Sequence, residues 1–523
     1  MPAHARVRRL AAAVGVALLL PAGAATATSA RGSTDGTPGS RGIGDPYYAD
    51  YGNGGYDVEH YNIQVAYRPR TDRLSGTTWI RAHTTQALSR FDLDFVLPVS
   101  GVRVNDRPAS YRQDGHELVV TPARALREGQ AMTVRVTYAG VPSRVRSEGV
   151  KPWIRSHAGA VAVGRPEIAA WWYPANDHPR DKATYDVRVT VAEDLEAVGN
   201  GILVSRHTHA KHTRHATRTW HWREADPMAP HASFVVVGQL DLTRTRVDGH
   251  PVVTAVPPAG GRVVRYAAAD VARTPEVVAF EARQFGSYPF DAMGGVVAAA
   301  GSVPAVGNQT RPVYARRSWR DGPNIYVVVH ENAHQWFGDS VSVENWRDSW
   351  LSEGFASWAE WRWSERHGDG DGRRLFRAAW DDHARDRDFW RVAIGDPGAH
   401  QEAGIAVLDR GAMALQALRT RIGGPAFFSV LRQWAAEHRH GNASISDFVA
   451  LAEEESGERL GPFFDAWLHA RQRPAPTEAN GFPRGFDARP ARPGSAGTAR
   501  VPASWEQIRR NHALLAMGSS TGG

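Results

Sequence analysis

The chain has 523 residues, of which 42% are hydrophobic, and a formal net charge of +7. This size and composition fit a globular protein of two or three domains. The basic residues are scattered and form no block of lysine and arginine, so the charge does not indicate a nucleic-acid partner. The lack of cysteine excludes disulfides, thiol catalysis, thiolate metal ligands and a lipid-modified cysteine anchor.

The first 30 residues have the pattern of a secretory signal peptide. Three arginines lie within positions 6–9, and the apolar run at 10–20 is too short to span a membrane. Small residues at and before Ala27 and Ala30 offer two alternative cleavage sites. No other apolar run approaches membrane length. We therefore expect a secreted, extracellular protein without stable membrane insertion, and the arginine pair favours twin-arginine export only weakly.

The next part of the chain changes from a linker composition to a strand pattern. Residues 31–46 are rich in Gly, Ser, Thr and Pro, which predicts a flexible linker. From about 47 to 245, apolar and polar residues alternate, and turn signals such as Asn105-Asp106 separate the runs. This pattern predicts an N-terminal antiparallel β domain. The alternation is clearest at Tyr61, Ile63, Val65 and Tyr67, at Met132, Val134, Val136 and Tyr138, and at Tyr185, Val187, Val189 and Val191.

From about 250 to 472 the apolar spacing is helical. The segment SISDFVALAEEESG, for example, is expected to start at a capping Ser446 and to stop at Gly457. Residues 473–523 are rich in Pro, Ala, Arg and Gly and contain one short helical candidate, SWEQIRRNHALLAM. We expect this basic tail to be largely disordered, either solvated or in contact with acidic surfaces.

The helical region contains the motif HENAH. His330 and His334 are four residues apart, so on a helix they lie on one face and can bind one Zn²⁺ through their ring nitrogens. Glu331 lies beside the first histidine, where it can act as a general base. Asn324 can cap this helix and Gly338 can end it.

A third ligand is needed, because tetrahedral catalytic zinc takes three protein ligands and leaves the fourth position to water. Glu353 stands nineteen residues after His334, in WLSEGFASWAEW, at the start of a second helical pattern. A pair of packed helices can bring it to the metal. Without this residue the motif is only suggestive, because His330 and His334 can also be ordinary core or surface histidines.

HENAHQWFGD followed by WLSEGFA resembles the M1 family of zinc aminopeptidases. The segments GDPYYADYGNGGYDVEHYNIQVAY, WWYPANDHPRDKATYDVRVTV and NQTRPVYA are similar to small, exported bacterial members, and the resemblance covers about residues 44–472. It implies a saddle-like β-sandwich domain at 47–245 and a thermolysin-like, mainly α-helical catalytic domain at 250–472. Larger members carry a further helical domain that closes over the site. We find no counterpart of it here and expect a more open site.

The resemblance also implies roles for individual residues. His330, His334 and Glu353 match the ligands of one Zn²⁺ ion. Glu331 matches the general base that activates the zinc-bound water for attack on a peptide carbonyl. The implied activity is hydrolysis of peptide bonds, of the aminopeptidase type.

Two positions that bind the substrate amine in the family are altered. The glutamate of the Gly-x-Met-Glu-Asn segment corresponds to Gly307, which has no side chain. A Gln or Glu of the β domain corresponds to Arg165, whose positive charge repels an ammonium group. Glu167 compensates if the alignment shifts by two residues. Loss of this anchor favours, as an alternative, endopeptidase action on internal peptide bonds.

A third altered position concerns the transition state. The family tyrosine that stabilises the oxyanion corresponds to Leu408, and the chain has no tyrosine after Tyr326. Loss of one oxyanion donor typically lowers turnover by about 10²–10³. The alternative donors nearby in the sequence are His400, Gln401 and Arg410.

The leading hypothesis is therefore an exported zinc metallopeptidase that acts as a monomer on peptide or protein substrates. The His/His/Glu set favours zinc over other divalent metals. The rival hypothesis is a catalytically impaired, zinc-retaining homologue that binds peptides or surfaces without cleaving them.

Overall fold

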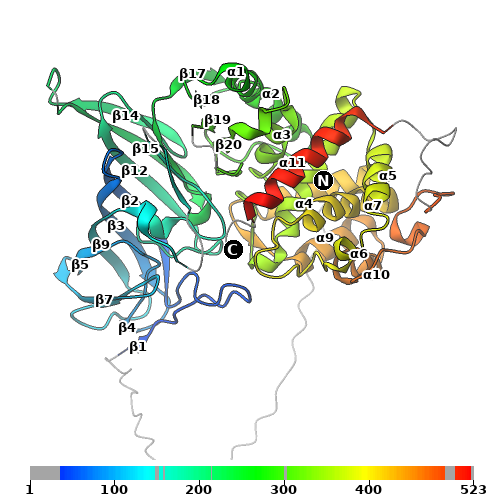
Figure 1. Ribbon diagram of the computed structural model, residues 1–523. Coiled ribbons are helices and arrows are strands. Elements are labelled where there is room, and N and C mark those ends of the chain that lie inside the picture. Colours follow the sequence, from blue (N-terminus) through cyan, green and yellow to red (C-terminus); the bar gives the residue numbers. More distant parts are fainter. Residues whose placement is uncertain are drawn as a thin grey trace, which may run out of the picture. The chain divides into compact units, whose positions relative to one another are not determined.

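The computed structural model describes residues 36–147, 152–156, 159–213, 215–299, 303–488 and 501–519. The predicted signal peptide at 1–30 lies outside these ranges. Within them, no helix is both long and apolar enough to cross a bilayer. The described chain begins with strands and continues into helices (Figure 1).

The N-terminal region is built on an eight-stranded sheet with the order β14-β15-β12-β2-β3-β9-β5-β6 (Figure 1). Neighbouring strands are antiparallel except β12 and β2, which are parallel. Its strands are β2 Tyr56–Arg68, β3 Arg73–Thr84, β5 Val99–Val104, β6 Arg107–Pro108, β9 Ala131–Gly140, β12 Ala183–Ala192, β14 Ile202–His209 and β15 Thr217–Met228.

A second sheet, of four antiparallel strands, shares its hydrophobic core with the first. The predicted β domain is thus confirmed, with one parallel pair. The order is β10 Trp153–Arg155, β11 Ala160–Ala162, β16 Val235–Gly238 and β13 Glu196–Val198. Short pairs complete the region: β1 Thr37–Pro38 with β4 Leu88–Arg90, and β7 Ser110–Asp114 with β8 Glu117–Thr121.

The period-two pattern places one face of each long strand in this core. The four inward positions predicted in β2 are all buried, and so are those in β9 and β12. Successive side chains of a strand point to opposite faces, which explains this result. The turn between β5 and β6 is made by Asn105 and Asp106, whose φ angles are 47° and 60°, as a two-residue hairpin turn requires.

Residues 36–46 belong to the folded region, which corrects the prediction of a flexible linker at 31–46. Asp45 is 3% exposed, and one of its carboxylate oxygens accepts a hydrogen bond from the backbone N–H of Trp346 at 2.8 Å. Gly42 allows close packing here, because a Cβ on it would lie 1.7 Å from the carbonyl oxygen of Ala49. Composition alone does not distinguish such a packed segment from a flexible one.

A mixed four-stranded sheet connects the β region to the helices. Its order is β17 Asp241–Val247, β18 His250–Val256, β19 Met293–Ala298 and β20 Val313–Ala315, and the last three strands are parallel. The prediction of a helical pattern from about residue 250 misses β18, β19 and β20. All six residues of β19 are buried, so no alternation marks it as a strand.

The C-terminal region is mainly helical, as predicted. The short strands β21 Ser342–Val343 and β22 Asn442–Ala443 pair within it. Its helices up to residue 464 are α1 Gly261–Val271, α2 Thr274–Phe285, α3 Ile325–Ala333, α4 Trp350–His367, α5 Gly372–Asp382, α6 Arg387–Arg391, α7 Gly411–Ile422, α8 Gly424–Glu437, α9 Ile445–Ser456 and α10 Gly461–Phe464.

Capping rules predict the C-terminal end of α9 correctly but not its N-terminal end. The helix stops at Gly457 in the left-handed conformation, as predicted. Its N-cap is Ser444, not Ser446. The Ser444 hydroxyl accepts from the backbone N–H of Asp447, and the two side chains form a capping box. Ile445 is already helical and buried, so the helix begins two residues earlier than predicted.

A helix in the C-terminal tail, α11 Ala503–Ser519, corrects the prediction of a largely disordered tail; residues 489–500 lie outside the described chain. The helix lies across α3 and α4 (Figure 1). The sequence of the tail did not indicate this buried face, because the segment is mostly polar. The members of that face are Ser504, Trp505, Ile508, Asn511 and His512.

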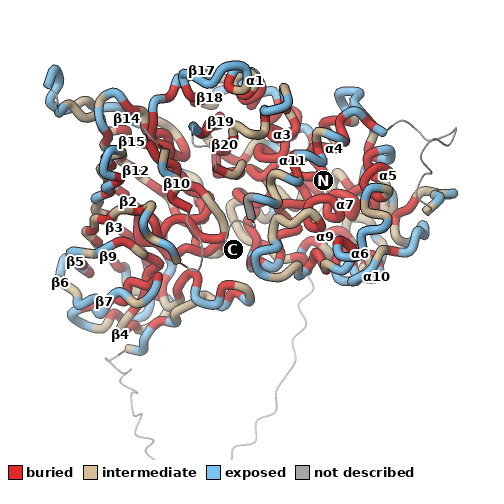
Figure 2. The backbone as a smooth tube through the Cα atoms, viewed as in Figure 1, coloured by how far each residue is buried: buried red, intermediate tan, exposed pale blue. Residues whose placement is uncertain are grey.

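Burial is concentrated inside the two regions, and exposed residues lie mostly in outer loops such as the turn between β14 and β15 (Figure 2). At least twelve of the 18 tryptophans are less than 2% exposed. Most tryptophans therefore serve core packing, as expected, and do not line a peptide groove.

Candidate metal centre

Helix α3 carries the two histidines of the motif. As predicted, Asn324 is its N-cap, and the side-chain oxygen accepts a backbone N–H of the first turn at 3.4 Å. The helix ends at Ala333, earlier than the expected Gly338, so His334 occupies the C-cap. His330 is 0% exposed and His334 is 2% exposed. Both rings are thus fixed inside the protein.

Glu353 lies in the first turn of α4 and reaches both histidines. Its Oε2 is 3.5 Å from His330 Nε2, and its Oε1 is 3.7 Å from His334 Nε2. Ligand atoms about 2.0–2.2 Å from one tetrahedral Zn²⁺ lie about 3.3–3.6 Å from one another. The structure therefore brings the three predicted ligands together around one point.

The outer nitrogens of both rings face oxygen atoms, and for His334 these include the Ser352 hydroxyl, which donates its own proton to the carbonyl oxygen of Phe337. His330 Nδ1 lies 2.8 Å from Glu360 Oε1, and His334 Nδ1 lies 3.1 Å from the carbonyl oxygen of Phe337. Each Nδ1 therefore carries a proton, and each Nε2 faces Glu353. Burial lowers the pKa of His334 to about 3, which keeps this ring in the neutral form that binds metals.

The donor set fits a zinc ion. Although His330 Nε2 is buried, it makes no hydrogen bond to any described residue. Burial opposes a charge on His330, but Glu353 and Glu360 outweigh it and raise the pKa to about 10. A cation at Nε2 would take the place of this proton. Two imidazole nitrogens and one carboxylate are donors that Zn²⁺ prefers.

Glu331 lies beside the first histidine and faces the same cavity. It is 1% exposed, and its Oε1 has no hydrogen-bond partner in the described part of the chain. Burial raises the pKa of Glu331 to about 7, with His330 acting in the opposite direction. A carboxylate with a near-neutral pKa can both accept and return a proton at neutral pH.

Arg165 of the β region reaches into the same centre. Its guanidinium donates to Glu353 Oε1, which leaves Oε2 facing His330. Burial opposes ionisation of Glu353, but His334 and Arg165 outweigh it and lower the pKa of this carboxyl. The cation that the sequence places at the amine-binding position thus lies directly beside the predicted ligands.

Gly307 also lies against the centre. A Cβ built on it would be 2.6 Å from both Cβ and Cδ2 of His334. Contacts of this length require the backbone or the histidine to move. Position 307 therefore offers neither a carboxylate nor room for one.

The residue at the position of the expected tyrosine has no polar side-chain atom that could stabilise an oxyanion. Leu408 is 0% exposed and lies in a π-helical turn, Ala406–Arg410. The Arg410 guanidinium donates to four backbone carbonyl oxygens, which holds it in place. Among the three alternative donors, the described cavity lining includes His400 but neither Gln401 nor Arg410.

A cavity of about 550 Å³ contains the centre, and four separate parts of the chain line it. Tyr48 comes from the N-terminal segment, His231 from the β region and Leu515 from α11. Trp346 packs edge-on against both Tyr48 and His231. Spacing in the sequence does not indicate these wall residues, because they come together only through the fold.

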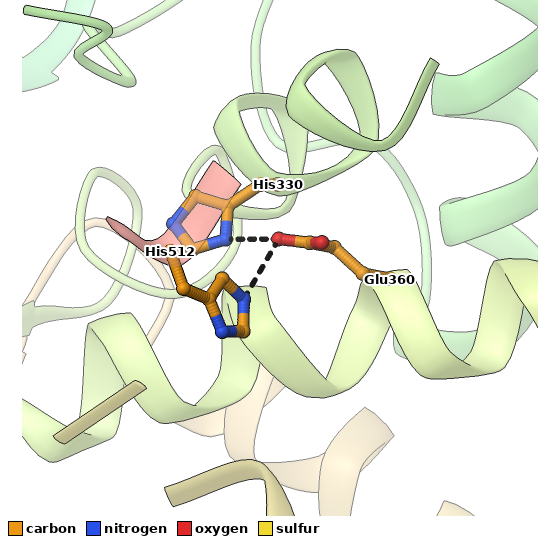
Figure 3. Close-up of side chains that lie close together, drawn as sticks. All are labelled: His330, Glu360 and His512. Atoms are coloured by element: carbon orange, nitrogen blue, oxygen red, sulfur yellow. Dashed lines mark hydrogen bonds and ion pairs between the residues drawn. The ribbon is translucent and has the colours of Figure 1, made fainter. Parts of the chain in front are cut away.

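A second layer of polar residues lies behind His330 (Figure 3). Glu360 accepts from His330, and its Oε1 is also 3.2 Å from Nε2 of His512. His512 Nδ1 lies 2.5 Å from Asp409 Oδ1. Burial opposes a charge on His512, but Glu360 and Asp409 outweigh it and raise the pKa to about 9. Glu360 was recognisable as a residue two helical turns after Glu353, whereas the sequence gives no signal for His512.

Comparison with known proteins connects this geometry to a family. A sequence profile described as "Peptidase family M1 domain" matches residues 315–467. Aminopeptidase M1 of Arabidopsis thaliana is 24% identical over 344 residues, which are 60% of this chain and 37% of that protein. Aminopeptidase N of Streptomyces lividans is 32% identical over 156 residues, which are 27% of this chain and 18% of that protein. This chain therefore matches no more than 37% of the length of either relative.

A solved structure matches over its whole length. The crystal structure of an M1 zinc metallopeptidase from Deinococcus radiodurans aligns with a TM-score of 0.74 and 26% identity. The alignment covers 83% of this chain and 99% of that one. A glutamate-to-alanine mutant of the Deinococcus radiodurans M1 zinc metallopeptidase, solved with a Tyr-Ser-Ala substrate, aligns with a TM-score of 0.73.

Proposed function

The chain belongs to the M1 family of zinc metallopeptidases, and on this basis we propose that it is a zinc-dependent peptidase of the aminopeptidase type. His330, His334 and Glu353 hold one Zn²⁺ ion, and Glu331 is the general base. One observation carries the proposal: these four buried side chains converge in a single cavity.

The residues of the chain have separate tasks in this mechanism. When bound, Zn²⁺ supplies a Lewis acid that lowers the pKa of water and polarises a peptide carbonyl. Glu331 accepts the proton of the attacking water and returns it to the leaving amine. Glu360 and the carbonyl of Phe337 hold the two histidine rings in the tautomer that binds metal. The cavity walls position the peptide.

The surroundings of the centre bear on which peptides are accepted. Gly307 has no room for a carboxylate, and Arg165 presents a positive charge. In the described lining, Glu402 is the one carboxylate besides Glu331 and Glu353, and it already accepts from Tyr48. A free amino terminus therefore has a weak anchor here, and we expect the preference for a free over a blocked amine to be small.

The activity is tested by metal removal and restoration. Fluorogenic peptides are incubated with the purified protein after chelation, and again after one equivalent of zinc is added. The proposal predicts hydrolysis that disappears on chelation and returns with zinc. The proposal would be contradicted if the zinc-restored protein, with one zinc bound per chain, hydrolysed the peptides no faster than background.

The amine preference is tested with matched peptides that carry either a free or an acetylated amino terminus. We expect the ratio of kcat/KM values to favour the free-amine series only slightly in the natural protein. Arg165→Gln removes the positive charge and restores a residue type that the family uses, so it should shift the ratio towards free amines. An unchanged ratio would show that Arg165 does not act on the substrate terminus.

A second candidate function follows from Leu408. Without a hydroxyl at this position, the transition state lacks the donor that the family tyrosine supplies, and the protein can act as a zinc-retaining peptide-binding protein with little turnover. Fluorescence anisotropy with labelled peptides distinguishes the two functions. Tight binding without cleavage over hours would favour the binding protein.

We include export and monomeric action in the proposal. Export rests on the signal-peptide pattern of residues 1–30. N-terminal sequencing of the protein recovered outside the cells should give a start close to residue 28 or 31. A product that retains the first residues would contradict export by cleavage.

A further inference from the structure

Helix α11 packs on the metal centre although it lies outside the family domain matched at 315–467. Several polar contacts fix its buried face, among them a 2.8 Å contact between the hydroxyls of Ser504 and Ser364. The indole nitrogen of Trp505 donates to Asp382 Oδ2 at 2.8 Å near the start of the helix. The side-chain amides of Asn511 and Asn324 bond to each other at the N-cap of α3, six residues before His330. The helix is therefore held in one position relative to α3.

His512 is the residue of α11 that reaches towards the metal ligands (Figure 3). It is 0% exposed, and each of its ring nitrogens faces a carboxylate oxygen. Nε2 lies 3.2 Å from Glu360 Oε1, and Nδ1 lies 2.5 Å from Asp409 Oδ1. Since ionised carboxylates only accept hydrogen bonds, both nitrogens donate.

The donor from His512 limits the rotation of the Glu360 carboxylate. Its Oε1 accepts from His330 Nδ1, while its Oε2 has no hydrogen-bond partner among the residues that the structure describes. The last torsion of a glutamate side chain is broad, so one hydrogen bond leaves the carboxylate free to turn. His512 approaches the same oxygen from another helix and restricts that rotation.

We propose that His512 is a positioning residue for the metal centre, which acts by fixing Glu360 so that Glu360 holds the ring of His330. The inference rests on the proposed function, because His330 is a ligand there. It makes the C-terminal helix a working part of the site. Loss of a partner that orients a metal-bound histidine typically weakens metal affinity by about 10–100-fold, and we expect about tenfold for a residue one bond further out.

The test compares two substitutions in the full chain. His512→Gln places an amide nitrogen near the former Nε2 and keeps a donor to Glu360. His512→Asn places it near the former Nδ1 and keeps a donor to Asp409. Trp505→Phe is the control, since it removes a docking bond of α11 without changing His512. Zinc dissociation constants are measured by competition with a chromogenic chelator, and thermal unfolding of the metal-free proteins reports helix docking.

The proposal predicts that His512→Asn weakens zinc binding by about tenfold, whereas His512→Gln and Trp505→Phe stay close to the natural protein. Equal affinities in all four proteins would overturn it. An equal loss in both His512 variants would also overturn it, because the bond to Glu360 would then not be the cause. A natural protein that binds zinc without cleaving peptides would contradict only the proposed function.

Discussion

Gly307 is a position where a single added methyl group would meet a predicted metal ligand. The built Cβ lies 2.6 Å from His334, so Gly307→Ala should push the ring of a predicted ligand out of place. We expect the free energy of unfolding to fall by about 1–3 kcal/mol, as for other overpacked sites. Zinc affinity should fall as well. Urea denaturation and chelator competition measure the two effects.

The control for this change is Gly238→Ala. Gly238 is also buried, but a Cβ there would meet nothing within 4 Å. It should keep its zinc affinity. If both variants bind zinc like the natural protein, the close approach at Gly307 has no effect on His334.

At the scale of residues, spacing predicted which side chains meet but not what surrounds them. His330, His334 and Glu353 converge as their helical positions require. Their role as ligands stays a proposal. His512 joins the site across about 180 residues of sequence distance from His330, and no local pattern encodes such a contact.

Among the elements, α3 depends on its first residue. Asn324 caps the helix and also bonds to Asn511 of α11. Asn324→Ala removes both contacts and should lower the free energy of unfolding by about 0.5–2 kcal/mol. Because α3 carries two predicted ligands, we expect zinc affinity to fall too.

Two variants separate the effects at Asn324. Asn324→Asp keeps the capping oxygen but loses the amide donor to Ser318 and Asn511, so it should recover only the part of the stability that comes from the cap. Ser444→Ala removes a cap of the same kind from α9, and it should cost a similar amount of stability without changing zinc binding. Equal zinc affinity in Asn324→Ala and Ser444→Ala would contradict a link between the α3 cap and the metal centre.

Element prediction succeeded where one face is buried and failed where both are. The alternating runs of β2, β9 and β12 gave correct strands. β19 is buried throughout and shows no period, so its apolar run was included in a helical region. Ser444 was missed as a cap because a second serine lies two residues later.

For the whole molecule, Lys182 connects the β region to the loops around the metal centre. Its ammonium donates to the carbonyl oxygens of Asp339, Ser340 and Gly441 at 2.7–3.0 Å. Burial lowers the pKa of Lys182 from 10.5 to about 7, with Asp339 acting in the opposite direction. Between these two values the unfolded chain binds more protons than the folded one.

The sign of the pH effect follows from this difference. Stability due to Lys182 rises as pH increases from about 7 to 10.5, and it is lost as pH falls back, by at most about 1.4 kcal/mol per pH unit. We therefore expect the stability difference between the natural protein and Lys182→Met to grow with pH in this window. Lys211→Met, at an exposed turn, should show no such trend in urea denaturation. A flat difference for Lys182→Met would contradict the desolvation of this ammonium in the folded protein.

The largest gap between sequence and structure concerns the ends of the described chain. Asp45 and His512 belong to segments whose composition predicts a flexible linker and a disordered tail, yet both are buried and hydrogen-bonded. Contacts with residues far away in the sequence hold these two segments in place, and amino-acid composition does not predict such contacts. Pro- and Gly-rich segments therefore complete the core and the site here.

The most direct test of the peptidase hypothesis compares the zinc-loaded natural protein with Glu331→Ala on the same panel of free and acetylated fluorogenic peptides. Glu331 touches the cavity but is not a predicted ligand, so the variant should keep its zinc. The account predicts cleavage by the natural protein and none above background by the variant. Equal rates from both proteins, each with one zinc bound, would contradict a catalytic role for Glu331.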